Sequence, residues 1–302
     1  MNESTRELLR KQKYQLVGEH SAVKLCHWLK ESIMRDRVCY KQKFYGIKSH
    51  RCLQMTPAVN WCTQKCLFCW RPVRFTEDIP ADVDEPREII EGSIEAQRIL
   101  LSGYQGVLDQ VNKNKLEEAQ DPNNVAISLS GEPTCYPRLP ELLEEFKKMD
   151  FTTFLVTNGT NPDIFEQMDT LPWNLYVTVA APNREVHKRL CNPVIPDAWE
   201  RLNRTIDLFP SLDTKKVMRL TMTKGYNMCE PESYAKIIER GEPTYVEVKA
   251  YMYVGFSRDR LTIDNMPRHE EIREFAQQIA SNCSYSVVNE SPESRVVLLS
   301  RE

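Results

Sequence analysis

Short apolar runs alternate along most of the chain with longer segments in which apolar residues recur every three or four positions. The short runs are typical of strands buried on both faces of a sheet, and the longer spacing is typical of amphipathic helices. Six strand–helix alternations predict an α/β fold in which a parallel sheet curves into an open or partial (β/α)6 TIM-like barrel. The expected strands are residues 55–60, 124–130, 152–157, 175–180, 216–223 and 245–254. The expected helices are residues 86–102, 139–149, 162–169, 184–190, 197–208, 231–240 and 269–281.

Two further segments follow other patterns. The apolar spacing over residues 5–34 predicts one N-terminal helix, and the polar stretch over residues 107–124 predicts a loop. We therefore expect an N-terminal extension over residues 1–54, followed by the barrel over residues 55–302, packed as one unit. Chemistry in such sheets lies at the C-terminal ends of the strands.

Charge is distributed unevenly along the chain. The formal net charge is −3, but residues 1–74 contain fifteen Lys and Arg against five Asp and Glu. A basic segment on an acidic chain favours a polyanionic partner on one side, and a solvated Lys-rich helix is the alternative. We find no apolar stretch of membrane-spanning length and no secretory signal in the first residues. We expect a soluble cytoplasmic protein without a membrane partner.

Six of the ten cysteines lie within residues 26–69, and three of these form a tight motif. Cys62, Cys66 and Cys69, the first triplet, directly follow the first expected strand with the spacing CxxxCxxC. Three thiolates on one loop can bind three irons of a cubane cluster and leave the fourth iron open to a ligand. Zinc is the alternative, but a structural zinc site requires four ligands.

The other three cysteines, Cys26, Cys39 and Cys52, form a second triplet with twelve residues in each interval. This spacing allows a second [4Fe–4S] cluster, again with an open iron. Two alternatives stand beside it, namely three buried structural cysteines or a zinc site completed by His27 or His50.

Two polar turns follow expected strands. Gly131, Glu132 and Pro133 come directly after the second strand, where a carboxylate can accept hydrogen bonds from a bound ammonium group. Thr157 and Asn158 end the third strand, where small polar groups can contact a ligand, with a simple polar turn as the alternative.

The first triplet, with the aromatic Phe68 before its last cysteine, resembles the signature of the radical S-adenosylmethionine (SAM) superfamily. In that superfamily the open iron binds SAM, and one electron cleaves SAM to a 5′-deoxyadenosyl radical. The segments CYKQKFYGIKSHRC over residues 39–52 and VKAYMYVG over residues 248–255 resemble one family within it, the archaeal single-domain tRNA 4-demethylwyosine synthases. This likeness covers residues 20–300. No flavodoxin-like domain precedes residue 1, so we expect a separate electron donor of the flavodoxin or ferredoxin type.

The resemblance implies a carbon–carbon lyase of wybutosine biosynthesis. Such an enzyme condenses pyruvate with N1-methylguanosine at position 37 of phenylalanine tRNA and so builds the third ring of the wyosine nucleoside. It also implies two [4Fe–4S] clusters, one on the first triplet beside SAM and an auxiliary one on the second triplet. The residues expected to contact SAM are Phe68, Gly131, Glu132, Pro133, Thr157 and Asn158.

Pyruvate activation has two candidate routes. The open iron of the auxiliary cluster can chelate its carboxylate and keto oxygens, or a lysine amine can form a Schiff base with its keto group. Lys41, two residues after Cys39, is the first candidate lysine, and Lys43 is the second. Phosphate contact or solvated charge is the alternative role for either lysine.

The basic front segment is the expected surface for tRNA, which predicts binding that weakens steeply with salt. The residues expected there are Lys11, Lys13, Arg35, Arg37, Lys48, Arg51, Arg71 and Arg74. Two other functions use the same features: another radical SAM enzyme acting on RNA, or a non-catalytic RNA-binding protein stabilised by zinc.

Overall fold

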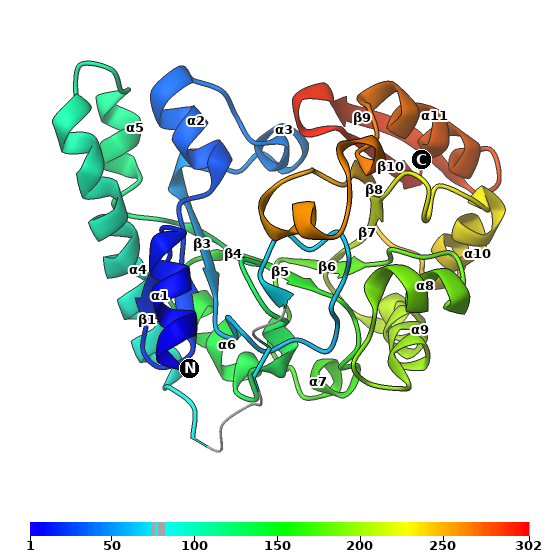
Figure 1. The fold of residues 1–302 in the computed structure, drawn as a ribbon, viewed down its shortest axis with the longest axis horizontal. Helices are drawn as coiled ribbons and strands as arrows, with labels where there is room; N and C mark the ends of the chain where they lie inside the picture. Colours follow the sequence, from blue (N-terminus) through cyan, green and yellow to red (C-terminus); the bar gives the residue numbers. More distant parts are fainter. Residues whose placement is uncertain (74–75, 78–81, 302) are drawn as a thin grey trace. The chain divides into compact units, whose positions relative to one another are not determined.

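The computed structural model describes residues 1–73, 76–77 and 82–301. The chain forms two compact units, and Figure 1 labels the helices and strands and colours them by residue number. The first unit comprises Met1–Cys62, Phe75–Val156 and Met168–Trp173, and the second comprises Thr63–Arg74, Thr157–Gln167 and Asn174–Glu302. The expected boundary after residue 54 lies inside the first unit and stays a prediction. Among the described residues, no helix is long and apolar enough to cross a membrane.

Three parallel strands form the centre of the first unit. They are β3 (Cys52–Thr56), β4 (Asn124–Ile127) and β5 (Thr152–Thr157). In their register, Asn124 of β4 lies opposite Cys52 of β3 on one side and Thr152 of β5 on the other. An antiparallel hairpin, β1 (Gln15–Val17) and β2 (Ser21–Val23), extends this sheet beyond β3. The helices of this unit are α1 (Glu3–Lys11), α2 (His27–Arg35), α3 (Tyr40–Tyr45), α4 (Pro86–Ser102), α5 (Lys113–Glu118) and α6 (Leu139–Lys148).

The prediction of one helix over residues 5–34 is wrong. Only α1 and α2 are helical, and the hairpin of β1 and β2 separates them. Gly18 forms its turn with φ +54°, and a Cβ at this position would lie 2.2 Å from Asp84 Oδ2. Glycine adopts this left-handed conformation without a steric cost, so the chain reverses there, and β2 pairs with β3 instead of continuing a helix.

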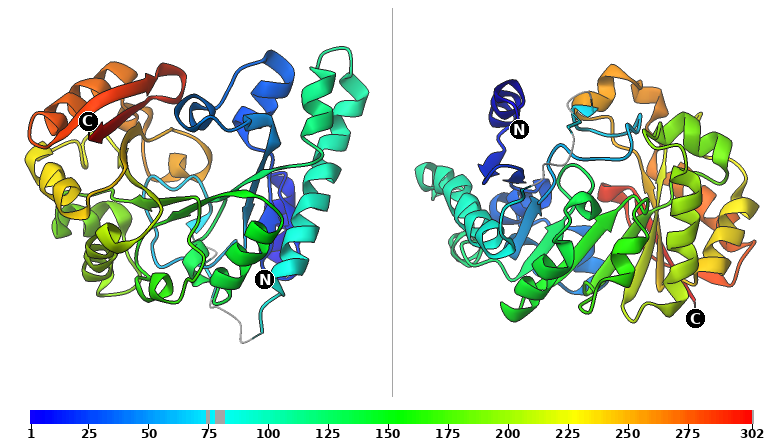
Figure 2. Two further views of the ribbon diagram at one scale, coloured as in Figure 1. Left: turned by 180° about the vertical axis from the view of Figure 1, so that it is seen from behind. Right: turned by 90° about the horizontal axis from the view of Figure 1, so that it is seen from below.

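The prediction of a plain loop over residues 107–124 is also wrong, because α5 lies inside this segment. Leu116 and Ala119 are buried in a small core that α2 and the end of α4 complete with Leu29, Ile33 and Leu101. Burial of this apolar surface stabilises the short helix, which is too short to be stable by itself. Figures 1 and 2 show α2 and α5 side by side near the end of α4.

Parallel strands also form the centre of the second unit. They are β6 (Asn174–Thr178), β7 (Lys215–Met222) and β8 (Tyr245–Ala250), and β10 (Val296–Arg301) joins β8 antiparallel, with β9 (Tyr285–Ser291) at the edge. The helices are α7 (Asp163–Glu166), α8 (Arg184–Cys191), α9 (Ala198–Leu208), α10 (Pro231–Gly241) and α11 (His269–Ala280).

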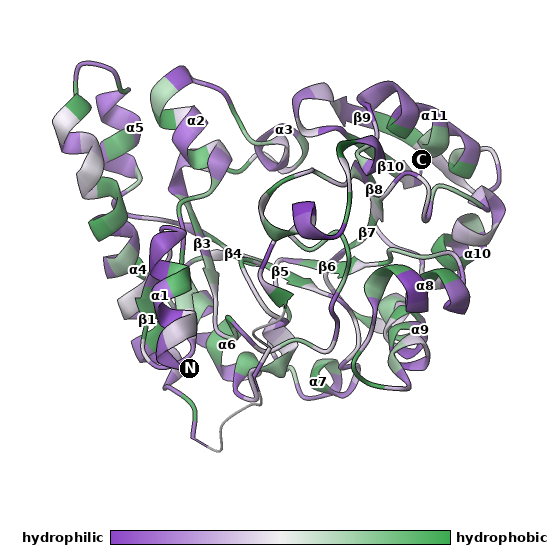
Figure 3. Cartoon of the chain, viewed as in Figure 1, coloured by the Kyte–Doolittle hydropathy of each residue, from purple (hydrophilic) through white to green (hydrophobic). Residues whose placement is uncertain are grey.

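Both units therefore confirm the α/β class with parallel central strands. Figure 3 shows hydrophobic and hydrophilic stretches on both α4 and α11, as expected for helices with one buried face. The predicted strands and helices of the barrel are present, most of them with shifted ends, whereas β9 and β10 were not predicted. The curvature into a partial barrel stays an expectation.

Candidate functional site

Cys62 follows a loop that the first unit holds tightly. Gly131 has φ +71°, and a Cβ at this position would lie 1.6 Å from the carbonyl oxygen of Ala58 and 2.7 Å from that of Trp61. A side chain at residue 131 would therefore push this loop away. The backbone N–H of Glu132 donates to the Trp61 carbonyl oxygen at 2.6 Å. The turn that contains Gly131 and Glu132 thus packs directly on the residue before Cys62.

The Glu132 carboxylate is buried and oriented by its own turn. Its Oε1 accepts hydrogen bonds from the Thr134 backbone N–H at 3.1 Å and from the Thr134 hydroxyl at 2.7 Å. Only 2% of the residue is exposed. The carboxylate caps the short helix η4 (Pro133–Cys135), which begins at the predicted Pro133. A carboxylate held in this way is suited to accept hydrogen bonds from a ligand ammonium group.

The rest of the first triplet lies in the second unit on a compact turn. The Cys69 N–H donates to the Cys66 carbonyl oxygen at 3.1 Å. Backbone hydrogen bonds connect this loop to the chain after α8: Lys65 N–H to Asn192 O at 3.0 Å, and Leu67 N–H to Leu190 O at 2.9 Å. Phe68, predicted to contact SAM, lies on the turn and is partly exposed. The two thiols are thus carried by a loop with a fixed backbone.

A glutamine–histidine pair supports this loop, and sequence reasoning missed it. The Cys66 thiol donates to Gln64 Oε1 at 3.2 Å, and Gln64 Nε2 lies 3.2 Å from His187 Nε2. Burial lowers the pKa of His187 to about 4, so the imidazole is neutral and can accept the amide hydrogen. His187 lies on α8 with its ring 5.4 Å from that of Trp199.

The predicted residues Thr157 and Asn158 lie beside the start of the same loop. Asn158 Nδ2 donates to the Thr63 hydroxyl at 3.0 Å, and this hydroxyl lies 2.6 Å from that of Thr160. Thr157 Oγ1 accepts the Gly159 N–H at 3.0 Å and so closes the turn. The polar turn after β5 therefore contacts the residue that follows Cys62, as the turn after β4 contacts the residue that precedes it.

The second triplet lies within the first unit. Cys26 and Cys39 precede α2 and α3, and Cys52 begins β3. Burial raises the pKa of the Cys52 thiol, the neighbouring Cys26 and Cys39 thiols raise it further, and the Lys41 ammonium lowers it. Such through-space effects require Cys26, Cys39 and Lys41 each to lie near Cys52.

The donor chemistry of both triplets suits iron. All six cysteines are partly exposed as residues, and no cysteine in the described residues forms a disulfide. Thiolates are the ligands that iron–sulfur clusters use. No three His, Cys, Asp or Glu side chains in the described part of the chain form a ready-made metal site. Three features therefore suit the two triplets to iron–sulfur clusters. They are the thiolate ligands, the compact turn that carries Cys66 and Cys69, and the position of Cys26 and Cys39 near Cys52.

The two candidate lysines lie on α3 in different environments. Lys41 is only 8% exposed, and its Nζ lies 4.3 Å from the centroid of the Phe154 ring on β5. Lys43 is exposed. The structure therefore distinguishes the two lysines, and Lys41 is the one near the second triplet.

Local hydrogen bonds explain why α3 is placed as it is. Gln42 Oε1 accepts the backbone N–H of Ser49 at 3.0 Å and its hydroxyl at 2.9 Å, and Ser49 Oγ accepts the Cys39 N–H at 3.4 Å. Gly46 ends the helix with φ +75°, a conformation that favours glycine. The segment between Cys39 and Cys52 therefore folds back on itself and brings its ends together.

Several residues expected to contact tRNA already have partners within the chain. Arg35 and Arg37 both pair with Glu31, at 2.5 and 3.3 Å, and Lys48 pairs with Glu118 at 2.9 Å. The three cationic side chains are largely exposed, whereas Glu31 is buried, and ion pairs with exposed members contribute little to stability. They do not prevent the side chains from exchanging partners with a phosphate.

The other expected tRNA contacts vary in exposure. Arg51 donates through Nε and Nη2 to one carbonyl oxygen at 2.9 and 2.7 Å. Lys11 and Lys13 are exposed, and Arg71 is partly exposed. Arg74 lies outside the described residues. The role of this set stays a prediction.

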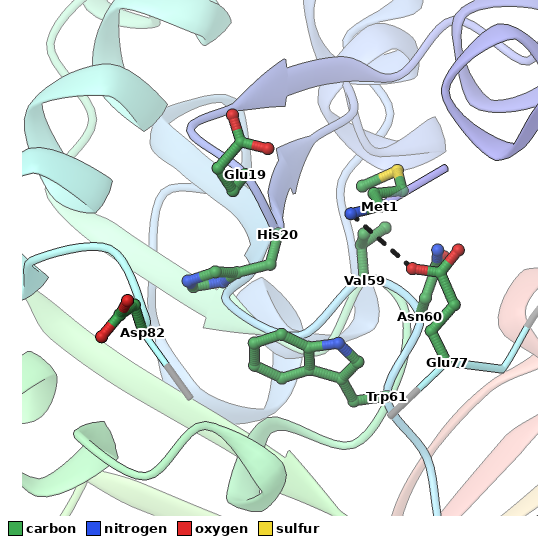
Figure 4. Close-up of a pocket in the computed structure, with 8 residues that line it drawn as sticks. All are labelled: Met1, Glu19, His20, Val59, Asn60, Trp61, Glu77 and Asp82. Carbon is green, nitrogen blue, oxygen red and sulfur yellow. Dashed lines mark ion pairs between the residues drawn. The ribbon is translucent and has the colours of Figure 1, made fainter. Parts of the chain in front are cut away.

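A cavity of about 230 Å³ opens beside the residue that precedes Cys62. Figure 4 shows the Trp61 ring next to His20, with their centroids 4.6 Å apart. His20 Nδ1 donates to Pro57 O at 2.6 Å, and its Nε2 accepts the Asp84 N–H at 2.9 Å. Burial lowers the pKa of His20. No sequence motif identifies His20, which contacts the loop before Cys62 through Pro57 and Trp61.

Comparisons with known proteins agree with these features. Residues 56–238 match the radical SAM superfamily, and residues 240–301 match the family of wyosine base formation. The S-adenosyl-L-methionine-dependent tRNA 4-demethylwyosine synthase of Pyrococcus abyssi is 53% identical over 308 residues, covering 100% of this chain and 90% of the relative. The protein of the same name from Methanocaldococcus jannaschii is 40% identical, covering 98% of this chain and 95% of the relative. A solved structure of TYW1 with a lysine–pyruvate adduct bound is similar with a TM-score of 0.91 at 40% identity, covering 100% of this chain and 97% of the other.

Proposed function

Because the chain belongs to the family of S-adenosyl-L-methionine-dependent tRNA 4-demethylwyosine synthases, we propose that it condenses pyruvate with N1-methylguanosine at position 37 of phenylalanine tRNA. The chain is a radical SAM enzyme of wyosine biosynthesis, and that membership implies SAM and one [4Fe–4S] cluster. The reaction joins two carbons of pyruvate to the base and releases its C1 carboxyl group, which is carbon–carbon lyase chemistry. The observation that carries the proposal is a buried lysine beside three cysteines in the first unit.

The first triplet would hold the cluster, and the turns after β4 and β5 would hold SAM. When bound, the cluster supplies the electron that cleaves SAM and so starts hydrogen abstraction from the N1-methyl group. Glu132 would accept hydrogen bonds from the SAM amino group. Asn158 is fixed by Thr63 and would orient the ribose or carboxylate. Gly131 allows the turn that carries Glu132 to pack against the loop before Cys62.

Lys41 would bind pyruvate covalently. Its amine attacks the C2 keto carbon, water leaves, and the resulting iminium accepts electrons from the adjacent bonds. Burial against Phe154 keeps bulk water away from this bond. A relative of the same family, TYW1, has been solved with a lysine–pyruvate adduct, which supports this route over chelation alone. The second triplet would hold an auxiliary cluster near the same amine.

The tRNA substrate must present a single base. Enzymes that act on a base take it out of its stack, and the basic residues of the front segment would bind the flanking phosphates. A separate low-potential protein of the flavodoxin or ferredoxin type would supply the electron.

Trapping the pyruvate adduct tests this function. The reconstituted enzyme is incubated with pyruvate and sodium borohydride and mapped by peptide mass spectrometry. We expect one reduced pyruvyl adduct on Lys41 in the wild type and in Lys43→Ala, and none in Lys41→Ala, with turnover lost in the last variant. An adduct on Lys43, or full turnover in Lys41→Ala, would contradict the role of Lys41 and favour chelation.

A further inference from the structure

Residues 251–260, which follow β8 in the second unit, are held by internal hydrogen bonds and are called the platform below. The platform contains the short helix η6 (Gly255–Asp259). The fully buried Ser257 accepts a hydrogen bond from the Tyr251 hydroxyl at 2.9 Å and donates to the Val254 carbonyl oxygen at 2.6 Å. Tyr251 itself is 2% exposed. Two buried hydroxyls therefore fix η6 to the end of the strand.

This platform is in direct contact with the loop of the first triplet. Gly255 has φ +58°, and a Cβ at its position would lie 2.3 Å from the carbonyl oxygen of Trp70. The Phe256 N–H donates to the same oxygen at 3.0 Å. Trp70 directly follows Cys69, so η6 fixes the end of the cysteine loop.

The positively charged side chain of Arg260, which follows η6, contacts the backbone of this loop. Its Nε donates to the Leu67 carbonyl oxygen at 3.2 Å, and its Nη2 donates to the Cys69 carbonyl oxygen. The side chain is partly buried, and its guanidinium group is a positively charged hydrogen-bond donor. Arg258, two residues earlier, instead donates to the Tyr253 carbonyl oxygen at 3.3 Å and lies over the Tyr253 ring. Of these two arginines, Arg260 is the one that holds the cysteine loop.

We propose that Arg260 is a positioning residue that fixes the backbone of the first triplet and stabilises the reduced state of its cluster. Reduction by an external one-electron donor adds one negative charge to the cluster, and hydrogen bonds and charge around its ligands set its potential. A guanidinium bound to the backbone of a ligand residue favours the state with the additional electron. Arg260 lies in the region that matches wyosine base formation, whereas the cysteines lie in the radical SAM region. The inference rests on the proposed function only for the presence of this cluster, and it requires neither pyruvate nor tRNA.

An anaerobic redox titration with dithionite tests the inference on the reconstituted full chain. The EPR signal that changes when SAM is added identifies the cluster of the first triplet. Four proteins are compared: wild type, Arg260→Gln, Arg260→Lys and the matched control Arg258→Gln. Iron and labile sulfide are counted in each protein. These counts distinguish a protein that lacks the cluster from one that contains the cluster but has an unchanged reduction potential.

We expect the four proteins to have the same iron content. At a fixed solution potential, the ratio of reduced to oxidised cluster should fall about tenfold in Arg260→Gln, which is a shift of about 59 mV to more negative potential for one electron. Arg260→Lys should recover part of this shift, and Arg258→Gln should match the wild type. Equal potentials in Arg260→Gln and the wild type would overturn the inference. An equal shift in Arg258→Gln would overturn it as well, because surface charge alone would then explain the effect.

Discussion

Replacing His187 should make the stability of this protein less sensitive to acid. Its pKa of about 4, caused by burial, lies below the ordinary value of 6.5. The native state therefore binds fewer protons than the unfolded state, and the free energy of unfolding falls as the pH drops from about 6.5 towards 4. The full effect is about 3 kcal/mol, of which about 2 kcal/mol is lost between pH 7 and pH 5. Protonation would also remove the acceptor for Gln64, which contacts Cys66.

Urea unfolding at pH 7 and pH 5 measures this effect. Wild type and His187→Asn are compared without added iron, so that cluster loss does not differ between them. The wild type should lose about 2 kcal/mol more than the variant on acidification. His20 is also buried with a lowered pKa, but it is present in both proteins and cancels in the comparison. Equal losses in the two proteins would refute the assignment of a buried, neutral His187.

Three further predictions concern the site. Gly131→Ala should lower the melting temperature and abolish SAM binding measured by calorimetry, because the new Cβ would lie 1.6 Å from a backbone oxygen. The control Gly106→Ala should change neither, because the space around Gly106 is open. Replacing all three cysteines of the second triplet by alanine should lower iron after anaerobic reconstitution from about eight to about four per chain, and unchanged iron would contradict an auxiliary cluster. Binding of tRNA, measured by fluorescence anisotropy, should weaken with salt. In the double variant Lys11→Ala and Lys13→Ala, the slope of log binding constant against log salt concentration should decrease in magnitude by about two. An unchanged slope would show that these two residues do not contact tRNA.

The parallel strands and their helices could be predicted from the sequence because burial on both faces leaves continuous apolar runs. The expected segment 152–157 is the whole of β5, and 86–102 is the whole of α4. The errors have physical causes as well. Gly18 reverses a segment whose apolar spacing is helical, and the edge strand β9 is half exposed and so has no continuous apolar run.

The site was predictable where its residues are close in sequence. The first triplet and the turn of Gly131 and Glu132 are local motifs. Gln64 and His187 contact each other across 123 residues, and Arg260 reaches Cys69 across 191 residues. Such partners depend on the packing of distant elements, and no spacing rule identifies them in a single sequence.

The most direct test of the proposed reaction follows the carbons of pyruvate into tRNA. Reconstituted enzyme, SAM, dithionite and tRNA containing N1-methylguanosine are incubated with pyruvate labelled with ¹³C either at C1 or at C2 and C3, and the nucleosides are analysed by mass spectrometry. We predict that 4-demethylwyosine forms and contains both labels from C2 and C3, and none from C1. A loaded enzyme that cleaves SAM but leaves N1-methylguanosine unchanged, or a product that contains C1, would contradict the proposed condensation.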